Sequence, residues 1–107
     1  DKGFDQYDNN QISNFTQILK TKLELFRSMA ERKGLYFNEE IELGLTVKAH
    51  PGALERILNN IIDNAIKFTP PGGTVVVCLT SDDERLVFEV MDNGPGIPDE
   101  RVAEALE

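Results

Sequence analysis

The most constraining feature of this sequence is an amphipathic segment enclosed between two proline-containing boundaries. Pro51 stands where the first turn of a helix tolerates proline, and residues 70–73 (PPGG) cannot continue a helix. Between these boundaries the apolar residues recur with the period of an α-helix, at Leu54, Ile57, Leu58, Ile61, Ile62 and Ala65. We therefore predict a helix from Pro51 to about residue 69, with its apolar stripe packed against the rest of the domain.

An earlier segment shows a second, less regular helical pattern. This first helix should begin near Asn14, with the Ser13 hydroxyl as its N-cap, and should end at Gly34. The preceding residues 1–11 are polar, and we interpret them as a linker or the start of an edge strand.

The remaining segments are short and predict strands. Two strands are expected at residues 36–43 and 46–49, and the β-branched and aromatic residues at 74–80 and 86–91 predict an antiparallel hairpin. Residues 101–106 are expected to begin another helix. This order of elements predicts one small domain of the α+β class, a sandwich with its helices on one face of a sheet.

Charge and cysteine content narrow the possible partners and compartment. A net charge of −8 repels nucleic-acid phosphates, so we expect no nucleic-acid partner. The single Cys78 cannot form an internal disulfide, and no apolar run approaches the ~18 residues that span a bilayer. The single cysteine favours a reducing, cytoplasmic setting. His50 is the only histidine, which argues against a histidine-based metal site or catalytic triad.

The predicted second helix carries a strip of polar side chains. Asn60, Asn64 and Lys67 fall on one strip beside the apolar stripe, while Arg56, Asp63 and Asn59 are expected to project further outward. Amide oxygens can bind a hard cation, and an ammonium group can neutralise phosphate. The strip therefore suits a Mg²⁺-phosphate group, although such residues are also common as solvated side chains on a half-exposed helix.

A second group of candidate residues follows the predicted hairpin. Residues 92–98 (DNGPGIP) come directly after an apolar strand, where the Asp92 carboxylate can accept a hydrogen bond from an exocyclic amine. Gly94 and Gly96 allow the backbone to approach a ligand closely. The alternative is a plain turn, because Asp, Asn, Gly and Pro are the commonest turn formers.

Taken together and in this order, the two segments resemble those of a known family. Residues 58–70 (LNNIIDNAIKFTP) resemble the N box of sensor histidine kinases, and residues 92–98 resemble their first glycine box. Upstream, residues 25–27 (LFR) and 30–35 (AERKGL) are similar to the first long helix of that family. We therefore interpret residues 12–107 as a partial histidine-kinase ATP-binding domain.

The resemblance implies the Bergerat ATP-binding fold, a two-layer sandwich whose sheet is mixed but mainly antiparallel. It also implies ATP and Mg²⁺ as cofactors, with Asn64 as the Mg²⁺ ligand and Asn60 lining the phosphate and metal site. Lys67 would contact the phosphates, and Phe68 would lie against the nucleotide.

The resemblance extends to the base-binding end of the site. Asp92 would accept a hydrogen bond from the adenine amine, and Gly94 and Gly96 would shape the floor of the pocket.

Position 60 distinguishes related activities on this fold. Hydrolytic relatives have Glu there as a general base, and serine-kinase anti-sigma factors also tend to have an acid, whereas Asn60 cannot abstract a proton near neutral pH. Phosphoryl transfer to a nucleophilic histidine needs positioning and charge stabilisation more than a base. The resemblance therefore implies transfer to a histidine on a separate dimerisation domain of the same kinase, with a response regulator as an indirect partner.

The chain also departs from the family pattern. The family often has Asp where His50 stands, and His is expected to cap the second helix less well. The family's lid and second glycine box are absent from these residues, so we expect the chain alone to be inactive and to self-associate. The alternative to a kinase domain is a degenerate or incomplete nucleotide-binding module that acts as a scaffold. The parent protein could be a membrane-bound sensor with this domain as its cytoplasmic part.

Overall fold

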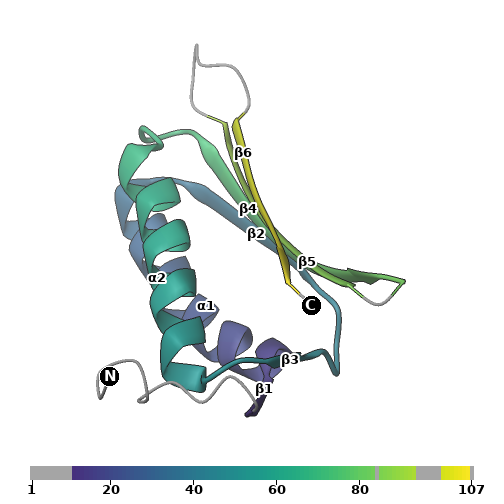
Figure 1. Cartoon of the computed structure of the whole chain (residues 1–107). Helices are drawn as coiled ribbons and strands as arrows, with labels where there is room; N and C mark the ends of the chain where they lie inside the picture. Colours follow the sequence, from purple (N-terminus) through teal and green to yellow (C-terminus); the bar gives the residue numbers. More distant parts are fainter. Residues whose placement is uncertain (1–10, 84, 94–99, 107) are drawn as a thin grey trace, which may run out of the picture.

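The computed structural model describes residues 11–83, 85–93 and 100–106. Two helices lie side by side and cover one face of a four-stranded sheet, which confirms the predicted two-layer α+β sandwich (Figure 1). In chain order the elements are β1 (Ile12–Asn14), α1 (Phe15–Lys33), β2 (Tyr36–Ile41), β3 (Thr46–Lys48), α2 (Pro51–Phe68), β4 (Thr74–Asp82), β5 (Arg85–Asn93) and β6 (Glu100–Leu106).

The main sheet is mixed but mainly antiparallel. Its strand order is β2-β4-β5-β6, in which β2 runs parallel to β4 and the other neighbours are antiparallel. The predicted hairpin is confirmed as β4 and β5. The strands β2 and β3 follow each other in sequence but lie in different sheets, because β3 pairs instead with β1.

The core lies between the sheet and the helices. Side chains of a strand alternate between its two faces. The buried residues therefore alternate along both strands: Val75, Val77 and Leu79 in β4, and Leu86, Phe88 and Val90 in β5. Phe15 of α1 packs against Phe88 of β5, with the ring centroids 5.9 Å apart. The buried residues of α2 belong to its predicted apolar stripe or directly adjoin it: Leu54, Leu58, Ile62, Ala65 and Ile66.

The start of α1 differs from the prediction. The Asn14 side chain, and not that of Ser13, caps the helix by accepting a hydrogen bond from the Gln17 amide at 3.0 Å. Ser13 is buried in β1, and its hydroxyl donates to the Ala49 carbonyl at 2.5 Å. The pairing of β1 with β3 draws Ser13 into the structure and leaves the next residue at the cap position. The helix ends as predicted at Gly34, whose φ of 86° is left-handed.

The end of the described chain also corrects a prediction. Residues 101–106, expected to begin a helix, lie in strand β6, which pairs antiparallel with β5. The backbone groups along this edge of β5 require partners, and strand pairing with distant residues overrides a local helical preference. Neither of the two described helices combines the length and apolarity needed to cross a membrane.

Candidate functional site

The first turn of α2 is held by the residue that precedes it. The His50 Nδ1 accepts a hydrogen bond from the Gly52 amide at 2.9 Å, and Pro51 occupies the first helical position. His50 therefore stands at the N-cap, the position that the family often gives to Asp. This cap and the buried stripe together decide which face of α2 points away from the core.

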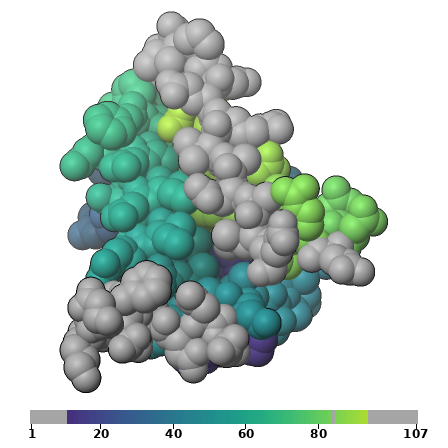
Figure 2. Space-filling model, viewed as in Figure 1, coloured from purple at the N-terminus to yellow at the C-terminus, as the bar shows by residue number. Residues whose placement is uncertain are grey.

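The predicted polar strip lies on the exposed face of α2. Asn60, Asn64 and Lys67 are all exposed, and Phe68 at the end of the helix is 71% exposed. This helix forms a large part of the molecular surface in the view of Figure 2. The structure thus brings four of the predicted site residues onto one accessible surface.

The predicted orientation of two neighbouring residues is wrong. Asn59 and Asp63 are half-buried, whereas Asn60 is exposed, so Asn59 does not project further outward than Asn60. Asn59 follows Glu55 by one helical turn, and Glu55 pairs with Lys22 of α1 at 3.2 Å. This flank of α2 therefore faces α1, which the sequence pattern of α2 alone does not reveal.

The last turn of α2 is tied down by side-chain donors. The buried Thr69 hydroxyl donates to the Ala65 carbonyl at 2.7 Å. From the end of α1, the Lys33 ammonium donates to the carbonyls of Ile66 and Lys67, at 2.7 Å each. Our reading of the sequence missed Lys33, although the adjacent prolines 70 and 71 signal that these carbonyls need donors from elsewhere.

A tight turn then connects α2 to the sheet. At Gly73 a Cβ atom would lie 2.5 Å from the Thr69 Cγ2 and 2.8 Å from the Asn93 carbonyl oxygen. The absence of a side chain at Gly73 therefore allows the end of β5 to approach the turn that follows α2. As a result, the end of β5 lies at the same end of the molecule as the last turn of α2 (Figure 1).

Asp92 lies near the end of β5, next to the residue that approaches Gly73. Asp92 is half-buried and lies opposite Val75 in the antiparallel pairing of β4 and β5. By alternation along the strand it shares the helix-covered face with Val90 and Phe88. The predicted residues Gly94 and Gly96 lie outside the described residues.

The side chains available at the candidate site determine how it could bind a metal ion. Among the described residues no group of three His, Cys, Asp or Glu side chains could hold a metal ion. The exposed amides of α2 fit Mg²⁺ in another way, because Mg²⁺ commonly takes one or two protein oxygens and completes its shell with substrate phosphates and water. Lys67 adds a positive charge to the same surface.

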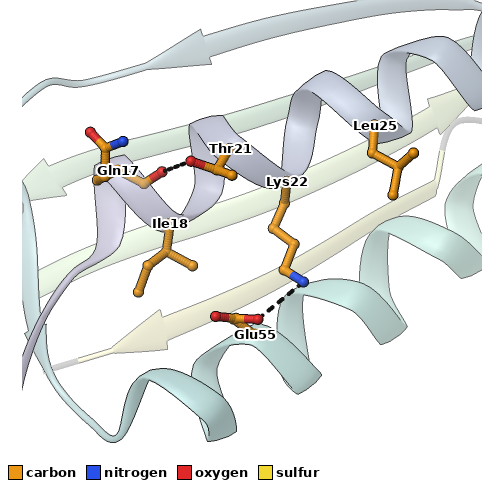
Figure 3. Close-up of a pocket in the computed structure, with 6 residues that line it drawn as sticks. All are labelled: Gln17, Ile18, Thr21, Lys22, Leu25 and Glu55. Atoms are coloured by element: carbon orange, nitrogen blue, oxygen red, sulfur yellow. Dashed lines mark hydrogen bonds and ion pairs between the residues drawn. The ribbon is translucent and has the colours of Figure 1, made fainter.

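A groove between the two helices lies elsewhere. It has a volume of about 360 Å³ and runs between α1 and α2, where Lys22 and Glu55 meet (Figure 3). None of the predicted site residues lines it; its walls are Gln17, Ile18, Thr21, Lys22, Leu25 and Glu55. The candidate site is therefore distinct from this groove.

Comparison with known proteins identifies the family. A family model described as "Histidine kinase-, DNA gyrase B-, and HSP90-like ATPase" matches residues 49–107, more than half of the chain. Sensor protein CreC of Escherichia coli (strain K12) is 35% identical over 98 residues, covering 83% of this chain and 21% of CreC. Aerobic respiration control sensor protein ArcB of the same strain is 39% identical over 95 residues, covering 87% of this chain and 12% of ArcB. The chain thus spans about a fifth or less of these relatives.

Solved structures agree on the fold. The catalytic domain of histidine kinase ThkA superimposes with a TM-score of 0.73 at 22% identity, covering 82% of this chain and 60% of that one. ThkA in complex with response regulator protein TrrA superimposes with a TM-score of 0.72 at 22% identity, covering 82% of this chain and 27% of ThkA. The chain therefore belongs to the histidine kinase-, DNA gyrase B- and HSP90-like ATPase family, as a catalytic domain of the sensor histidine kinase type.

Proposed function

We propose that this domain binds Mg-ATP on the exposed face of α2 and supplies the γ-phosphoryl group to a histidine on a separate dimerisation domain of the same kinase. One observation carries the proposal. In a domain of an ATP-binding family, two amides and an ammonium group share one exposed helix face, and Gly73 in the turn after that helix approaches the carbonyl of Asn93, the residue that follows Asp92.

The proposed roles follow from the chemistry of each side chain. Asn64 offers its amide oxygen to Mg²⁺, which neutralises phosphate charge when bound. Asn60, one turn earlier, lines the phosphate and metal site, and Lys67 contacts the phosphates as a point charge. Phe68 presents an exposed aromatic ring to the nucleotide. Asn60, Asn64 and Lys67 are the residues to which we assign catalysis.

The base-recognition role belongs to the other side of the site. Asp92 is proposed to accept a hydrogen bond from the adenine amine, with Gly94 and Gly96 shaping the pocket floor. An ionised carboxylate only accepts hydrogen bonds, so it suits an amine and not a carbonyl.

The residue at position 60 favours transfer over hydrolysis. An amide cannot take a proton from water near neutral pH, and no general base is required when the acceptor is a nucleophilic imidazole. What the domain must supply is position and charge stabilisation. Asn60, Asn64 and Lys67 can provide both.

The proposed partners follow from this transfer. The direct partner is the histidine-bearing dimerisation domain, and a response regulator would receive the phosphoryl group afterwards. The solved complex of ThkA with response regulator TrrA supports the second step by analogy. Because ATP is the proposed donor, we place the domain in the cytoplasm.

Metal-dependent binding tests the proposal most directly. In the full-length product of the gene that encodes these residues, Asn64→Ala should weaken Mg-ATP binding at least about tenfold, since even outer-shell metal partners contribute this much. Asn59→Ala is the matched control, because Asn59 lies on the flank of α2 that faces α1. Calorimetry should show an affinity close to wild type for the control. Equal losses in both variants would contradict the assignment of faces, and no Mg-ATP binding by the wild type would favour a scaffold module.

The acceptor can be located in the same protein with ATP labelled at the γ-phosphate. The label should appear on a histidine outside residues 1–107, because His50 is engaged as the N-cap of α2. Peptide mapping of the acid-labile label would locate the modified histidine. Label on His50 would contradict the proposal that the acceptor histidine lies on a separate domain.

A further inference from the structure

The end of α1 contributes a charged group to the end of α2. Lys33 is the last residue of α1, and its half-buried side chain places Nζ 2.7 Å from both the Ile66 and the Lys67 carbonyl oxygens. One ammonium group therefore bridges two consecutive carbonyls of another helix, 33 and 34 residues away in sequence.

The sequence of α2 creates the need for this donor. In a continuing helix, the carbonyls of Ile66 and Lys67 would accept from the amides four residues later. Those residues are Pro70 and Pro71, and proline has no N–H group. The Lys33 ammonium supplies the missing donors and places a positive charge at the negative end of the helix dipole.

The tied turn is also the turn that faces the proposed phosphate site. Lys67, whose carbonyl accepts from Lys33, carries the side chain assigned to the phosphates, and the 71% exposed Phe68 follows it. The backbone of this turn therefore sets where both exposed side chains project. Asn64 lies one turn earlier on the same face.

We propose that Lys33 is a positioning residue for the nucleotide site. By holding the Ile66 and Lys67 carbonyls, it fixes the last turn of α2 and thereby aims the Lys67 side chain at the phosphates. The inference rests on the proposed nucleotide-binding function and deepens it, because Lys33 itself does not touch the nucleotide.

A second contact between α1 and α2 provides a control variant. It tests whether the loss of any lysine that links the two helices has the same effect as the loss of Lys33. Lys22 also extends from α1 to α2, where it pairs with Glu55 at 3.2 Å (Figure 3). This pair lies toward the first turns of α2, away from Lys67. Lys33→Met and Lys22→Met therefore remove the same charge from the same helix, but only Lys33→Met frees the last turn.

Nucleotide affinity distinguishes the two variants. In the full-length protein, at a temperature where every variant is folded, Lys33→Met should raise the Kd for Mg-ATP about tenfold, the effect of a charged hydrogen bond. Lys22→Met should bind like the wild type, and Lys33→Arg should restore most of the affinity. Equal affinity of Lys33→Met and Lys22→Met would overturn the proposal. If Lys33→Met does not fold, Lys33→Gln, which keeps N–H donors without the charge, takes its place under the same criterion.

A double-mutant cycle tests whether Lys33 acts through Lys67. In a Lys67→Met background the further change Lys33→Met should alter the Kd less than about twofold, because residues that act as one unit are not additive. A full additional tenfold loss would show that Lys33 acts independently of Lys67 and would overturn the inference.

Amide hydrogen exchange without nucleotide separates this inference from the proposed function. Lys33→Met should accelerate exchange at the amides of residues 65–68, whereas Lys22→Met should not. Unchanged exchange in Lys33→Met would refute the positioning role, whether or not the protein binds ATP. A wild type that fails to bind Mg-ATP would refute the nucleotide function, and with it the proposal that Lys33 aims Lys67 at phosphates.

Discussion

Asp92 shows how a single residue acquires its place from the strand that carries it. It lies near the end of β5, on the face of the sheet that the helices cover, and is half-buried there. Glu89, three residues earlier, lies on the opposite face of the same strand. Although the two carboxylates are close in sequence, only Asp92 lies on the face of the sheet that the helices cover.

This difference makes a prediction about base selectivity. If Asp92 accepts from the adenine amine, the protein should prefer ATP to GTP, whose corresponding group is a carbonyl. Asp92→Ala should remove most of that preference, because a hydrogen bond to a charged group contributes roughly 1.5–3 kcal/mol. Competition binding with the two nucleotides measures the effect, and Glu89→Ala is the control. An Asp92→Ala protein that still discriminates as well as the wild type would contradict the role.

At the scale of elements, the turn between α2 and β4 joins the two parts of the candidate site. Within it the Gly73 amide donates to the Pro70 carbonyl at 3.0 Å, and the Gly73 carbonyl accepts from the Tyr36 amide at 2.9 Å. The same residue packs against Thr69 and the Asn93 carbonyl. Helix α2 and strands β2 and β5 therefore meet at one position that has no room for a side chain.

We predict that Gly73→Ala destabilises the fold more than a glycine substitution elsewhere. The added Cβ would lie 2.8 Å from the Asn93 carbonyl oxygen, so backbone must move, and the free energy of unfolding should fall by roughly 3 kcal/mol. Gly44→Ala is the control, because Gly44 has a φ of 77° but open space around it. Its cost should be the left-handed strain alone, roughly 1 kcal/mol. Urea denaturation compares the two, and equal losses would contradict the close approach at Gly73.

At the scale of the whole molecule, β2 is an edge strand of the main sheet. Arg27 of α1 covers part of this edge: its Nη1 donates to the Phe37 carbonyl at 3.1 Å, and its guanidinium pairs with Glu39. The guanidinium also lies over the Phe37 ring, 5.5 Å from its centroid. Open backbone groups on an edge strand invite pairing with another chain, so a charged side chain there protects against association.

Removal of this cover should promote self-association. Arg27→Ala exposes the Phe37 carbonyl on the β2 edge, and we expect the protein to form dimers or larger species at concentrations where the wild type forms fewer. Arg32→Ala, at an exposed position of the same helix, should behave like the wild type. Sedimentation velocity over a concentration series measures the difference. Identical profiles for all three proteins would show that Arg27 does not protect the edge.

Local chemistry made several features of this protein predictable from its sequence. The apolar period and the flanking prolines define α2 almost to the residue, and Gly34 ends α1. Alternating β-branched and aromatic residues define the β4–β5 hairpin. The exposed face that carries Asn60, Asn64 and Lys67 follows from the same helical period. Each of these features depends on residues that are close together in the sequence, so the sequence pattern alone is enough to predict it.

Tertiary structure alone decided the contacts between distant segments. The sequence did not reveal that β2 pairs with β4 while β3 pairs with β1, nor that residues 101–106 form a strand against β5. It also misplaced Asn59, which is half-buried, and gave no direct indication of Lys33 at the end of α2. Pairing partners and helix flanks are selected by packing among residues that are far apart in the chain. A local sequence pattern can indicate that a carbonyl lacks a hydrogen-bond donor, but only the folded chain decides which side chain donates to that carbonyl.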